Sequence, residues 1–298
     1  MAKDRREAFI VNSWFQKSWW LYLLLPISLL YWLITCTRAY CYRTGLIESY
    51  RASVPVVVVG NITVGGSGKT PVVIAIVQAL KEQGIKPAVI SRGYGGRAPT
   101  YPYDVDRSSL AEHSGDEPLL IAMRTEVPVV VGANRADAIN HLLKHHPCDV
   151  IIADDGLQHL RLQRDIEIVV VDAQRQFGNS LLLPAGPLRE SVSRLNSVDY
   201  IVHNGDEVAQ HYADYPNVEQ YGMQLQATAL TNIHSGEQCS VPSWSHSKKI
   251  HAVAGIGNPQ RFFATLRALN FDVIEHSFDD HHHFLASDLQ FNDNLPIV

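Results

Sequence analysis

The feature that most constrains the fold is a valine-rich run that leads directly into a glycine-rich loop. Val54–Ile62 reads VPVVVVGNI, which is typical of a strand buried on both faces of a sheet. Beyond the loop, Thr70–Gly84 has apolar residues at the i, i+3, i+4 and i+7 spacing of a helix. Pro71 lies near the expected helix start, where its missing N–H costs little. A strand, a glycine-rich loop and a helix in this order favour an α/β fold.

The loop itself, TVGGSGKT, is a candidate phosphate-binding loop. Glycines allow backbone N–H groups to curl around phosphate oxygens, a lysine reaches the β- and γ-phosphates, and a hydroxyl binds Mg²⁺. The strict pattern has glycine at position 63, where this chain has threonine. The alternative is a glycine-rich turn with a chance Gly-Lys-Thr, but the strand–loop–helix context favours a nucleotide site. The predicted ATP-binding residues are Thr63, Val64, Gly65, Gly66, Ser67, Gly68, Lys69 and Thr70.

Strand and helix patterns alternate along the middle of the chain. The further strand candidates are Pro87–Ser91, Val127–Val131, Val150–Ala153, Glu167–Asp172 and Tyr200–His203, with a helix over Arg135–Lys144. This alternation predicts an α/β fold, namely a P-loop NTPase-type, mostly parallel sheet. A polar stretch then precedes a second strand–loop–helix pattern in Ile250–Val273. We therefore expect an N-terminal helix in residues 1–38, a P-loop domain in 39–220, and a linker with a smaller α/β domain in 221–298.

The N-terminal region contains a charge-free stretch of 20 residues, SWWLYLLLPISLLYWLITCT, between Lys17 and Arg38. A helix of this length is long enough to cross the hydrocarbon of a bilayer. Tryptophan and tyrosine at both of its ends resemble interfacial aromatic belts. A buried or interfacial helix is the alternative, because Pro26 lies near the middle of the stretch. A membrane anchor is favoured, and basic residues on both sides leave its orientation open.

The composition of the chain argues against some classes of binding partner. The chain of 298 residues has a formal net charge of −5, and its charged fraction is 18%. A nucleic-acid-binding domain normally carries a basic surplus, so no nucleic-acid partner is expected. The cysteines, Cys36, Cys41, Cys148 and Cys239, form no CxxC pair, which fits a reducing compartment and no cysteine zinc site. No protein partner is evident.

A second acidic segment completes the nucleotide-site pattern. Asp154 and Asp155 end the strand candidate DVIIADDG, where P-loop proteins place the carboxylate that holds Mg²⁺. An ordinary Asp-Gly turn is the alternative, but the order and spacing after the P-loop favour the metal role. The segment at His203, HNGD, lacks the lysine of a guanine-reading Asn-Lys-x-Asp motif, so ATP is expected rather than GTP.

Several other loops carry charged residues suited to phosphoryl transfer, which requires a base and a cation. In GDEP, Asp116 and Glu117 are paired carboxylates or a solvated acidic loop, and Pro118 is expected to end any helix there. Arg189 follows two prolines and a glycine that stiffen its loop, and a surface charge is the alternative for a lone loop arginine. Arg92 lies at the C-terminal end of a strand candidate, in the glycine-rich turn SRGYGG, where α/β sheets bind ligands. DDHHHF, residues 279–284, is consistent with a metal cluster, a histidine base or a solvated loop.

Together these segments resemble the tetraacyldisaccharide 4′-kinase family, the lipid A 4′-kinases of Gram-negative bacteria. The matching pieces are the N-terminal apolar helix, GNITVGGSGKTP, SRGYGG, GDEP, DDGLQH, LLPAGPLRE and DDHHHF, in family order along essentially the whole chain. The resemblance implies an ATP- and Mg²⁺-dependent kinase at the inner membrane, with its catalytic domains on the cytoplasmic side. Its substrate would be the 4′-hydroxyl of a tetraacylated disaccharide 1-phosphate, a lipid A precursor.

The resemblance also implies roles for individual residues. The catalytic aspartate falls on Asp116, paired with His281, with the adjacent His282 as the alternative. Such a pair can accept the proton of the sugar hydroxyl. Lys69 and Arg189 would complete the catalytic set by holding phosphoryl charge. The implied Mg²⁺ residues are Thr70, Glu117, Asp154 and Asp155, and the implied substrate residues are Arg92, Gln158 and His159.

The chain departs from the family pattern at its C-terminal end. Family members usually continue through a Thr-Glu-Lys-Asp segment, whereas this sequence ends at Asn294–Val298, so a truncated second domain is expected. The competing interpretations are a membrane-tethered regulatory P-loop ATPase without a sugar-lipid acceptor, and an inactive remnant of the kinase.

Overall fold

A computed structural model describes residues 10–205, 215, 217–256, 259–279, 282 and 284–298. The described residues divide into two compact units, one that ends at Gln224 and one over Leu225–Val298.

The larger unit is built around an eight-stranded sheet in the order β3-β4-β2-β5-β1-β6-β7-β8. Its strands are β1 (Val56–Gly60), β2 (Pro87–Ser91), β3 (Tyr103–Val105), β4 (Val129–Val131), β5 (Val150–Asp154), β6 (Ile166–Asp172), β7 (Tyr200–Asn204) and β8 (Glu219–Met223). All neighbours pair in parallel except β3 and β4. The expected P-loop NTPase-type, mostly parallel sheet is therefore confirmed.

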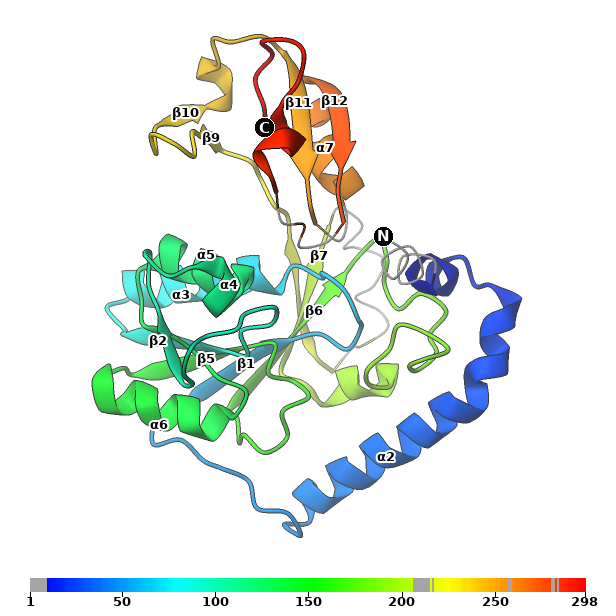
Figure 1. The fold of residues 1–298 in the computed structure, drawn as a ribbon. Coiled ribbons are helices and arrows are strands. Elements are labelled where there is room, and N and C mark those ends of the chain that lie inside the picture. Colours follow the sequence, from blue (N-terminus) through cyan, green and yellow to red (C-terminus); the bar gives the residue numbers. More distant parts are fainter. Residues whose placement is uncertain (1–9, 206–214, 216, 257–258, 280–281, 283) are drawn as a thin grey trace. The chain divides into compact units, whose positions relative to one another are not determined.

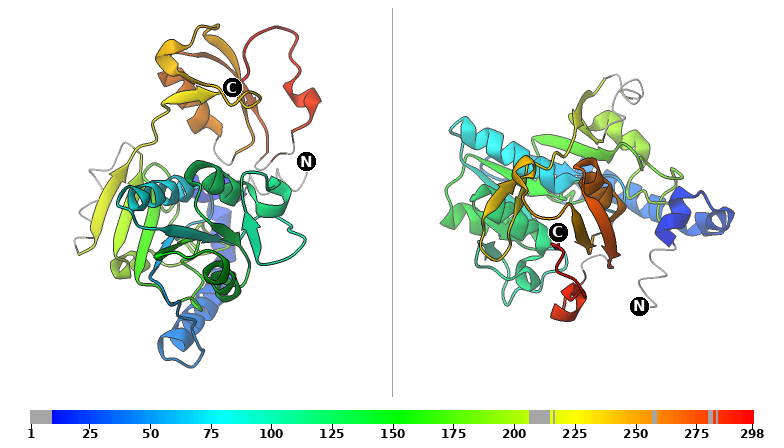
Figure 2. Two further views of the ribbon diagram at one scale, coloured as in Figure 1. Left: turned by 90° about the vertical axis from the view of Figure 1, so that its left-hand side faces the viewer. Right: turned by 90° about the horizontal axis from the view of Figure 1, so that it is seen from above.

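Helices cover both faces of this sheet (Figures 1 and 2). They are α3 (Lys69–Glu82), α4 (Ala111–Ser114), α5 (Asp116–Thr125), α6 (Arg135–His145) and the 3₁₀ turn η2 (Val192–Ser197). Side chains alternate between the two faces of a strand, so neighbouring valines of β1 enter different cores. Val58 packs in the cluster that contains Leu142 of α6, and Val59 in the cluster that contains Val73 of α3. Each buried valine contributes roughly 1.5–3 kcal/mol relative to exposure.

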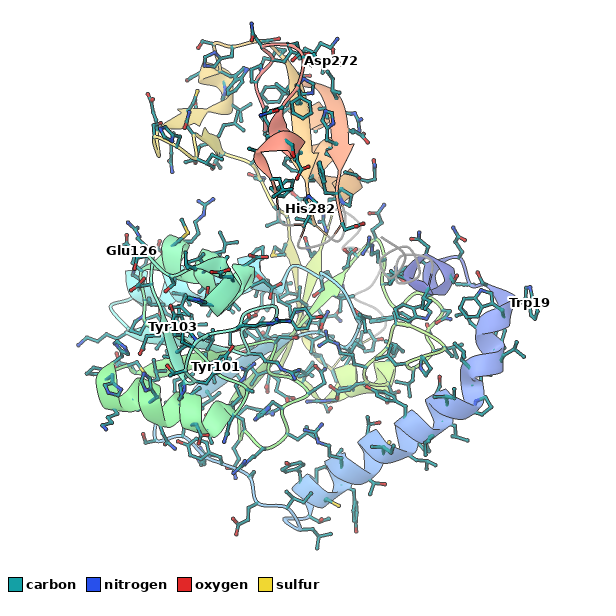
Figure 3. All side chains as sticks on the ribbon, in the orientation of Figure 1. Trp19, Tyr101, Tyr103, Glu126, Asp272 and His282 are labelled. Carbon is teal, nitrogen blue, oxygen red and sulfur yellow. The ribbon has the colours of Figure 1, made fainter. Side chains whose placement is uncertain are left out.

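The apolar N-terminal stretch forms a 3₁₀ turn, η1 (Trp19–Leu24), followed by the helix α2 (Leu25–Arg43). Pro26 lies in the first turn of α2, where no i−4 hydrogen bond is lost, so it starts the α-helix rather than breaking it. The segment Trp19–Arg43 is long and apolar enough to cross a membrane by length and composition. Trp19 is 75% exposed and projects away from the helix (Figure 3).

The smaller unit contains two parallel strands, β11 (Lys249–Ala254) and β12 (Asp272–Ser277), joined through α7 (Pro259–Ala268). Phe263 and Leu266 of α7 pack on Ile250 and Ala252 of β11, which gives this unit its own core. Its remaining elements are the hairpin β9 (Ala229–Thr231) and β10 (Gln238–Ser240), and the 3₁₀ turns η5 (Val241–Ser243) and η6 (Ala286–Leu289).

The structure corrects two expectations about boundaries. The expected domain boundary after residue 220 falls inside β8, because Glu219–Met223 pairs with β7 and extends the large sheet. In GDEP, Pro118 does not end a helix but lies in the first turn of α5, which begins at Asp116. A proline is tolerated there because the first N–H groups of a helix have no intrahelical partner. The division of the chain into anchor, P-loop domain and smaller domain stays a prediction.

Candidate active site

The glycine-rich loop connects the end of β1 to the first turn of α3 and is held by side chains from neighbouring strand ends. Asn204, at the end of β7, donates from Nδ2 to the Ser67 carbonyl at 2.9 Å. Gly68 has φ of +94°, and a Cβ there would collide with the Asn204 amide, so only glycine fits. The amide of Asn61 donates to the Gly65 carbonyl at 3.3 Å. The loop is therefore fixed before any ligand binds.

The surface of this loop is open where a phosphate would lie. A Cβ built on Gly65 or Gly66 meets nothing within 4 Å. The Ser67 hydroxyl is buried and has no hydrogen-bond partner in the described part of the chain. The loop runs into the N-terminus of α3, where free N–H groups and the helix dipole favour an anion. These features fit a bound polyphosphate. Thr63 and Val64 instead lie against the Pro187–Leu188 segment, through a bridge and a 2.8 Å backbone hydrogen bond.

Beneath the loop, three charged side chains meet. Lys69 is only 8% exposed, and its Nζ lies 3.5 Å from Asp155 Oδ1. Arg189 Nη1 lies 3.2 Å from Asp155 Oδ2. Burial alone would raise the pKa of Asp155, but Lys69 and Arg189 outweigh it and hold this pKa below its usual value. Two cations therefore converge on one carboxylate at the carboxyl end of β5.

The neighbouring Asp154 is fully buried at the end of β5. Its Oδ2 accepts a hydrogen bond from the Ser91 hydroxyl at 3.1 Å, whereas Oδ1 accepts none from any residue that the structure describes. Burial, followed by the charge of Glu117, raises the pKa of Asp154 to about 7, although Lys69 lowers it. A buried carboxylate oxygen without a donor suits a cation, so the residues present fit Mg²⁺.

Arg135 is a site residue that sequence reasoning missed. It starts α6, is 2% exposed, and donates to the backbone carbonyls of Gly132 and Asp154 at 2.9 and 3.2 Å. Burial lowers the pKa of Arg135 to about 10, while the charges of Asp154 and Asp155 raise it. The only sequence signal was general: Arg135 follows the buried strand β4 by four residues, and the carboxyl ends of parallel strands share one edge of a sheet.

The GDEP and SRGYGG segments lie next to each other on this edge. A Cβ on Gly96 would stand 2.5 Å from the His113 carbonyl and 2.7 Å from the Gly115 nitrogen, so the two backbones are in close contact. Asp116 and Glu117 are exposed in the first turn of α5, and Arg92 is exposed after β2. The charge of Glu117 raises the pKa of Asp154, and the charge of Arg92 lowers the pKa of Arg135. Glu117 and Arg92 therefore lie near the buried side chains of Asp154 and Arg135.

Gln158 and His159 follow Asp155 in the loop after β5. Gln158 donates from Nε2 to the Asn61 carbonyl at 2.9 Å and to Glu190 Oε1 at 2.7 Å, and its Oε1 accepts from Arg189 at 3.2 Å. Burial, reinforced by Arg135, Arg164 and other arginines, lowers the pKa of His159 to about 4, so its ring is neutral near pH 7. Gln158 therefore links the phosphate loop to the Arg189 loop.

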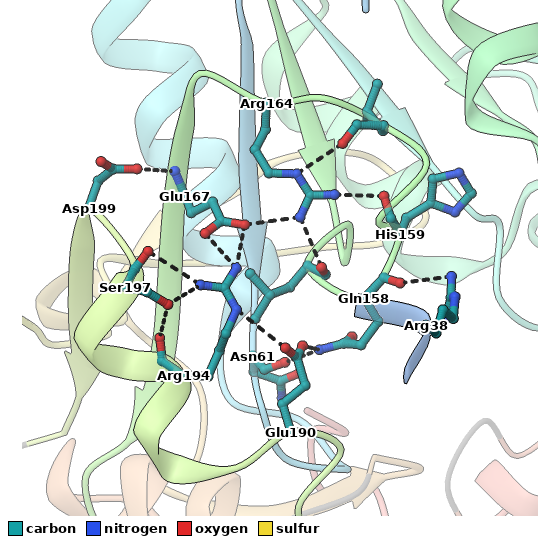
Figure 4. A network of polar contacts seen from close by, with 12 residues as sticks. Arg38, Asn61, Gln158, His159, Arg164, Glu167, Glu190, Arg194, Ser197 and Asp199 are labelled. Atoms are coloured by element: carbon teal, nitrogen blue, oxygen red, sulfur yellow. Dashed lines mark hydrogen bonds and ion pairs between the residues drawn. The ribbon is translucent and has the colours of Figure 1, made fainter. Parts of the chain in front are cut away.

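A buried ion-pair network supports this arrangement from below (Figure 4). Glu167 of β6 accepts from Arg164 at 3.0 Å and from Arg194 at 2.5 Å. Arg194 also lies 3.3 Å from Glu190, the partner of Gln158. Arg164 donates to the carbonyls of Leu157, His159 and Leu162. The network ties β6, η2 and the loop after β5 into one framework.

The expected base histidine, His281, lies outside the described residues. Its neighbour His282 belongs to the smaller unit, where Nε2 lies 3.1 Å from Asp288 Oδ2 and the ring stacks on Phe278. Within the described part of the chain, no group of three or more His, Cys, Asp or Glu side chains is arranged to hold a metal. The metal-cluster alternative for DDHHHF falls partly on residues that the structure does not describe.

A parallel sheet whose central strand feeds a glycine-rich loop and a helix, beside an acidic strand end, defines a P-loop NTPase-type α/β protein. A sequence model of the tetraacyldisaccharide-1-P 4′-kinase family matches residues 20–296. The chain belongs to this family.

Individual relatives agree. The chain is 49% identical over 277 residues to the tetraacyldisaccharide 4′-kinase of Mannheimia succiniciproducens, covering 93% of this chain and 82% of that protein. It is 47% identical over 296 residues to the enzyme of that name from Hahella chejuensis, covering 98% and 85%. Its fold is similar to that of LpxK from Aquifex aeolicus, crystallised in complex with ATP, with a TM-score of 0.72 and 28% identity over 88% of this chain and 82% of that one.

Proposed function

We propose that this chain transfers the γ-phosphate of ATP to the 4′-hydroxyl of a tetraacyldisaccharide 1-phosphate, a step of lipid A biosynthesis. The observation that carries the proposal is the convergence of Lys69 and Arg189 on Asp155 beneath an open glycine loop. This arrangement provides two cations where a transferring phosphoryl group develops charge. Family membership supplies the acceptor, because the relatives are named for it.

In the reaction we propose, the part of the loop from Gly65 to Thr70 holds the triphosphate through its backbone N–H groups. The acceptor oxygen forms a bond to the γ-phosphorus as the bond from that phosphorus to the β–γ bridging oxygen breaks, and ADP leaves. As acceptors for the proton of the sugar hydroxyl we propose Asp116 and His281, with His282 as the neighbouring alternative. Lys69 and Arg189 stabilise the charge of the transferring group.

The unpartnered Oδ1 of Asp154 supports an Mg²⁺ requirement. The candidate residues for the ion are Thr70, Asp154, Asp155 and Glu117. No three carboxylates among the described residues come together as a metal site, so we propose that Asp154 and Thr70 would hold the ion together with phosphate oxygens. When bound, Mg²⁺ neutralises negative charge on the phosphate oxygens. For the acceptor, we propose Arg92, Gln158 and His159 as binding residues. The low pKa of His159 keeps its ring neutral, so it binds by hydrogen bonding rather than as a cation.

The exposed apolar surface of η1 and α2 supports a location at the inner membrane, with the catalytic units on its cytoplasmic side. Ile27, Leu29, Leu30 and Ile34 of α2 are each more than half exposed. An exposed apolar surface of this kind favours insertion into lipid. A substrate with four acyl chains stays in the bilayer, so an enzyme held at the surface meets it there.

The direct test is γ-phosphate transfer from labelled ATP to tetraacyldisaccharide 1-phosphate in mild detergent. We expect transfer by the wild type. Lys69→Ala should lower kcat by roughly 10²- to 10³-fold, the range for one lost electrostatic donor. Asp116→Asn should lower it by roughly 10²- to 10⁴-fold if the pair acts as the base. Glu112→Gln, an exposed carboxylate four residues before Asp116, serves as the matched control and should retain full activity. Acceptor-independent ATP turnover without transfer would instead identify a regulatory ATPase.

A further inference from the structure

The apolar helix α2 carries a narrow polar stripe. Ser28, Tyr31, Thr35 and Arg38 are spaced by three, four and three residues, so they lie along one face. The intervening positions, including Leu29, Leu30, Leu33 and Ile34, are exposed and apolar. Thr35 bonds within the helix, to the Tyr31 carbonyl at 3.0 Å. The other three side chains of the stripe contact the loops that carry site residues.

Two of these contacts hold the LLPAGPLRE loop. The Ser28 hydroxyl donates to the Leu182 carbonyl at 3.0 Å and accepts from the Ala185 N–H at 3.1 Å. The Tyr31 hydroxyl donates to the backbone carbonyl of Arg189 at 2.9 Å. Upstream of the helix, Trp14 adds a bond from Nε1 to the Pro184 carbonyl at 3.1 Å. The loop is therefore fixed to the N-terminal segment along its length.

The third contact reaches the loop after β5. Arg38 donates to the backbone carbonyl of Gln158 at 3.3 Å. The side chains of Gln158 and Arg189 are themselves joined at 3.2 Å, and Arg189 continues to Asp155. The polar stripe thus bonds to the backbones of two residues whose side chains line the candidate phosphoryl-transfer site.

We infer that α2 is a positioning element of the active site as well as a lipid-facing helix, and that the Tyr31 hydroxyl acts through Arg189. By fixing the Arg189 carbonyl, Tyr31 sets where the guanidinium meets Asp155. The helix that we propose to face lipid therefore also fixes the position of the Arg189 guanidinium in the site. The inference rests on the proposed kinase function for its kinetic consequence, but not for its structural one.

The kinetic test is the substitution of Tyr31 by phenylalanine, which removes only the side-chain hydroxyl. Tyr31→Phe should lower kcat by about 2- to 10-fold, the effect of one hydrogen bond, and leave KM for the lipid within twofold. Tyr40→Phe, at a 63% exposed tyrosine on the same helix, is the matched control and should match wild type. In an Arg189→Lys background, Tyr31→Phe should cost little more, because both changes act on one group. Full additivity in this cycle, or a change confined to KM, would overturn the inference.

A second readout is independent of activity. The amides of Ala185, Leu188 and Arg189 are hydrogen-bonded in the wild-type loop. Hydrogen exchange of the peptide covering residues 182–189 should accelerate at least threefold in Tyr31→Phe, but not in Tyr40→Phe. Equal exchange in the two variants would refute the positioning role even if the wild type proved to have no kinase activity. Accelerated exchange in a chain without transfer would keep the positioning role and reject the proposed reaction.

Discussion

At the scale of single residues, the most informative group is Asp154. Its carboxyl is fully buried, one oxygen lacks a donor among the described residues, and burial raises its pKa to about 7. An ionised, buried carboxyl without a hydrogen-bond donor lowers the stability of the folded chain, so stability alone does not explain an aspartate here. The cost is expected where a cation binds, which is consistent with its proposed metal role.

This pKa has a consequence for stability. A folded pKa of about 7, above the unfolded value near 4, means that the folded chain binds the extra proton between these pH values. Without ligand, the Asp154 contribution to stability therefore falls as pH rises through this window. The stability gained by Asp154→Asn should grow by roughly 2–3 kcal/mol between pH 5 and pH 8. Urea unfolding at the two pH values measures it, with Glu82→Gln as the exposed control.

An equal gain at both pH values would show that the Asp154 carboxyl is ionised at an ordinary pKa. The same variant should bind Mg²⁺–ATP more weakly than the wild type.

The sequence predicted the site candidates that a local motif marks, such as Lys69, Asp154 and Asp155, and the structure places Lys69 Nζ 3.5 Å from Asp155 Oδ1. Sequence reasoning missed residues that act through backbone carbonyls of distant segments. Asn204 holds Ser67, and Arg135 holds the Asp154 carbonyl, across 137 and 19 positions respectively. Only the order of the strands brings these partners together, so no local spacing predicts them.

At the scale of elements, burial decided which strands could be predicted. The central strands β1, β2, β5 and β6 are mostly buried and largely apolar, and their observed bounds lie within two residues of those expected. The edge strands β3 and β8 were missed. The residues of β8 are only partly buried or exposed, so its sequence lacks an apolar signal and its pairing depends on β7.

The ion-pair network of Figure 4 is the element-scale feature most open to test. Glu167→Gln removes the charge that Arg164 and Arg194 share and leaves two largely buried guanidinium groups undercompensated. We expect a loss of about 2–4 kcal/mol in the free energy of unfolding. Glu126→Gln breaks the exposed pair with Arg107 and should cost less than about 1 kcal/mol. Similar losses in denaturant titrations of the two variants would contradict this role for the network.

At the scale of the whole molecule, the two units each have their own core. The larger unit contains the phosphate loop, Asp154, Asp155 and Asp116, while the DDHHHF segment belongs to the smaller one. The residues proposed as catalytic are thus divided between the two units along the sequence.

The central claim is that the whole chain phosphorylates one particular hydroxyl. The most direct measurement is ¹H–³¹P correlation NMR of the lipid recovered after incubation with the chain, ATP and Mg²⁺. We expect one new phosphomonoester signal, correlated with the proton at the 4′ carbon and missing from the Lys69→Ala reaction. A new phosphate correlated with another sugar position, or inorganic phosphate alone beside unchanged lipid, would contradict it.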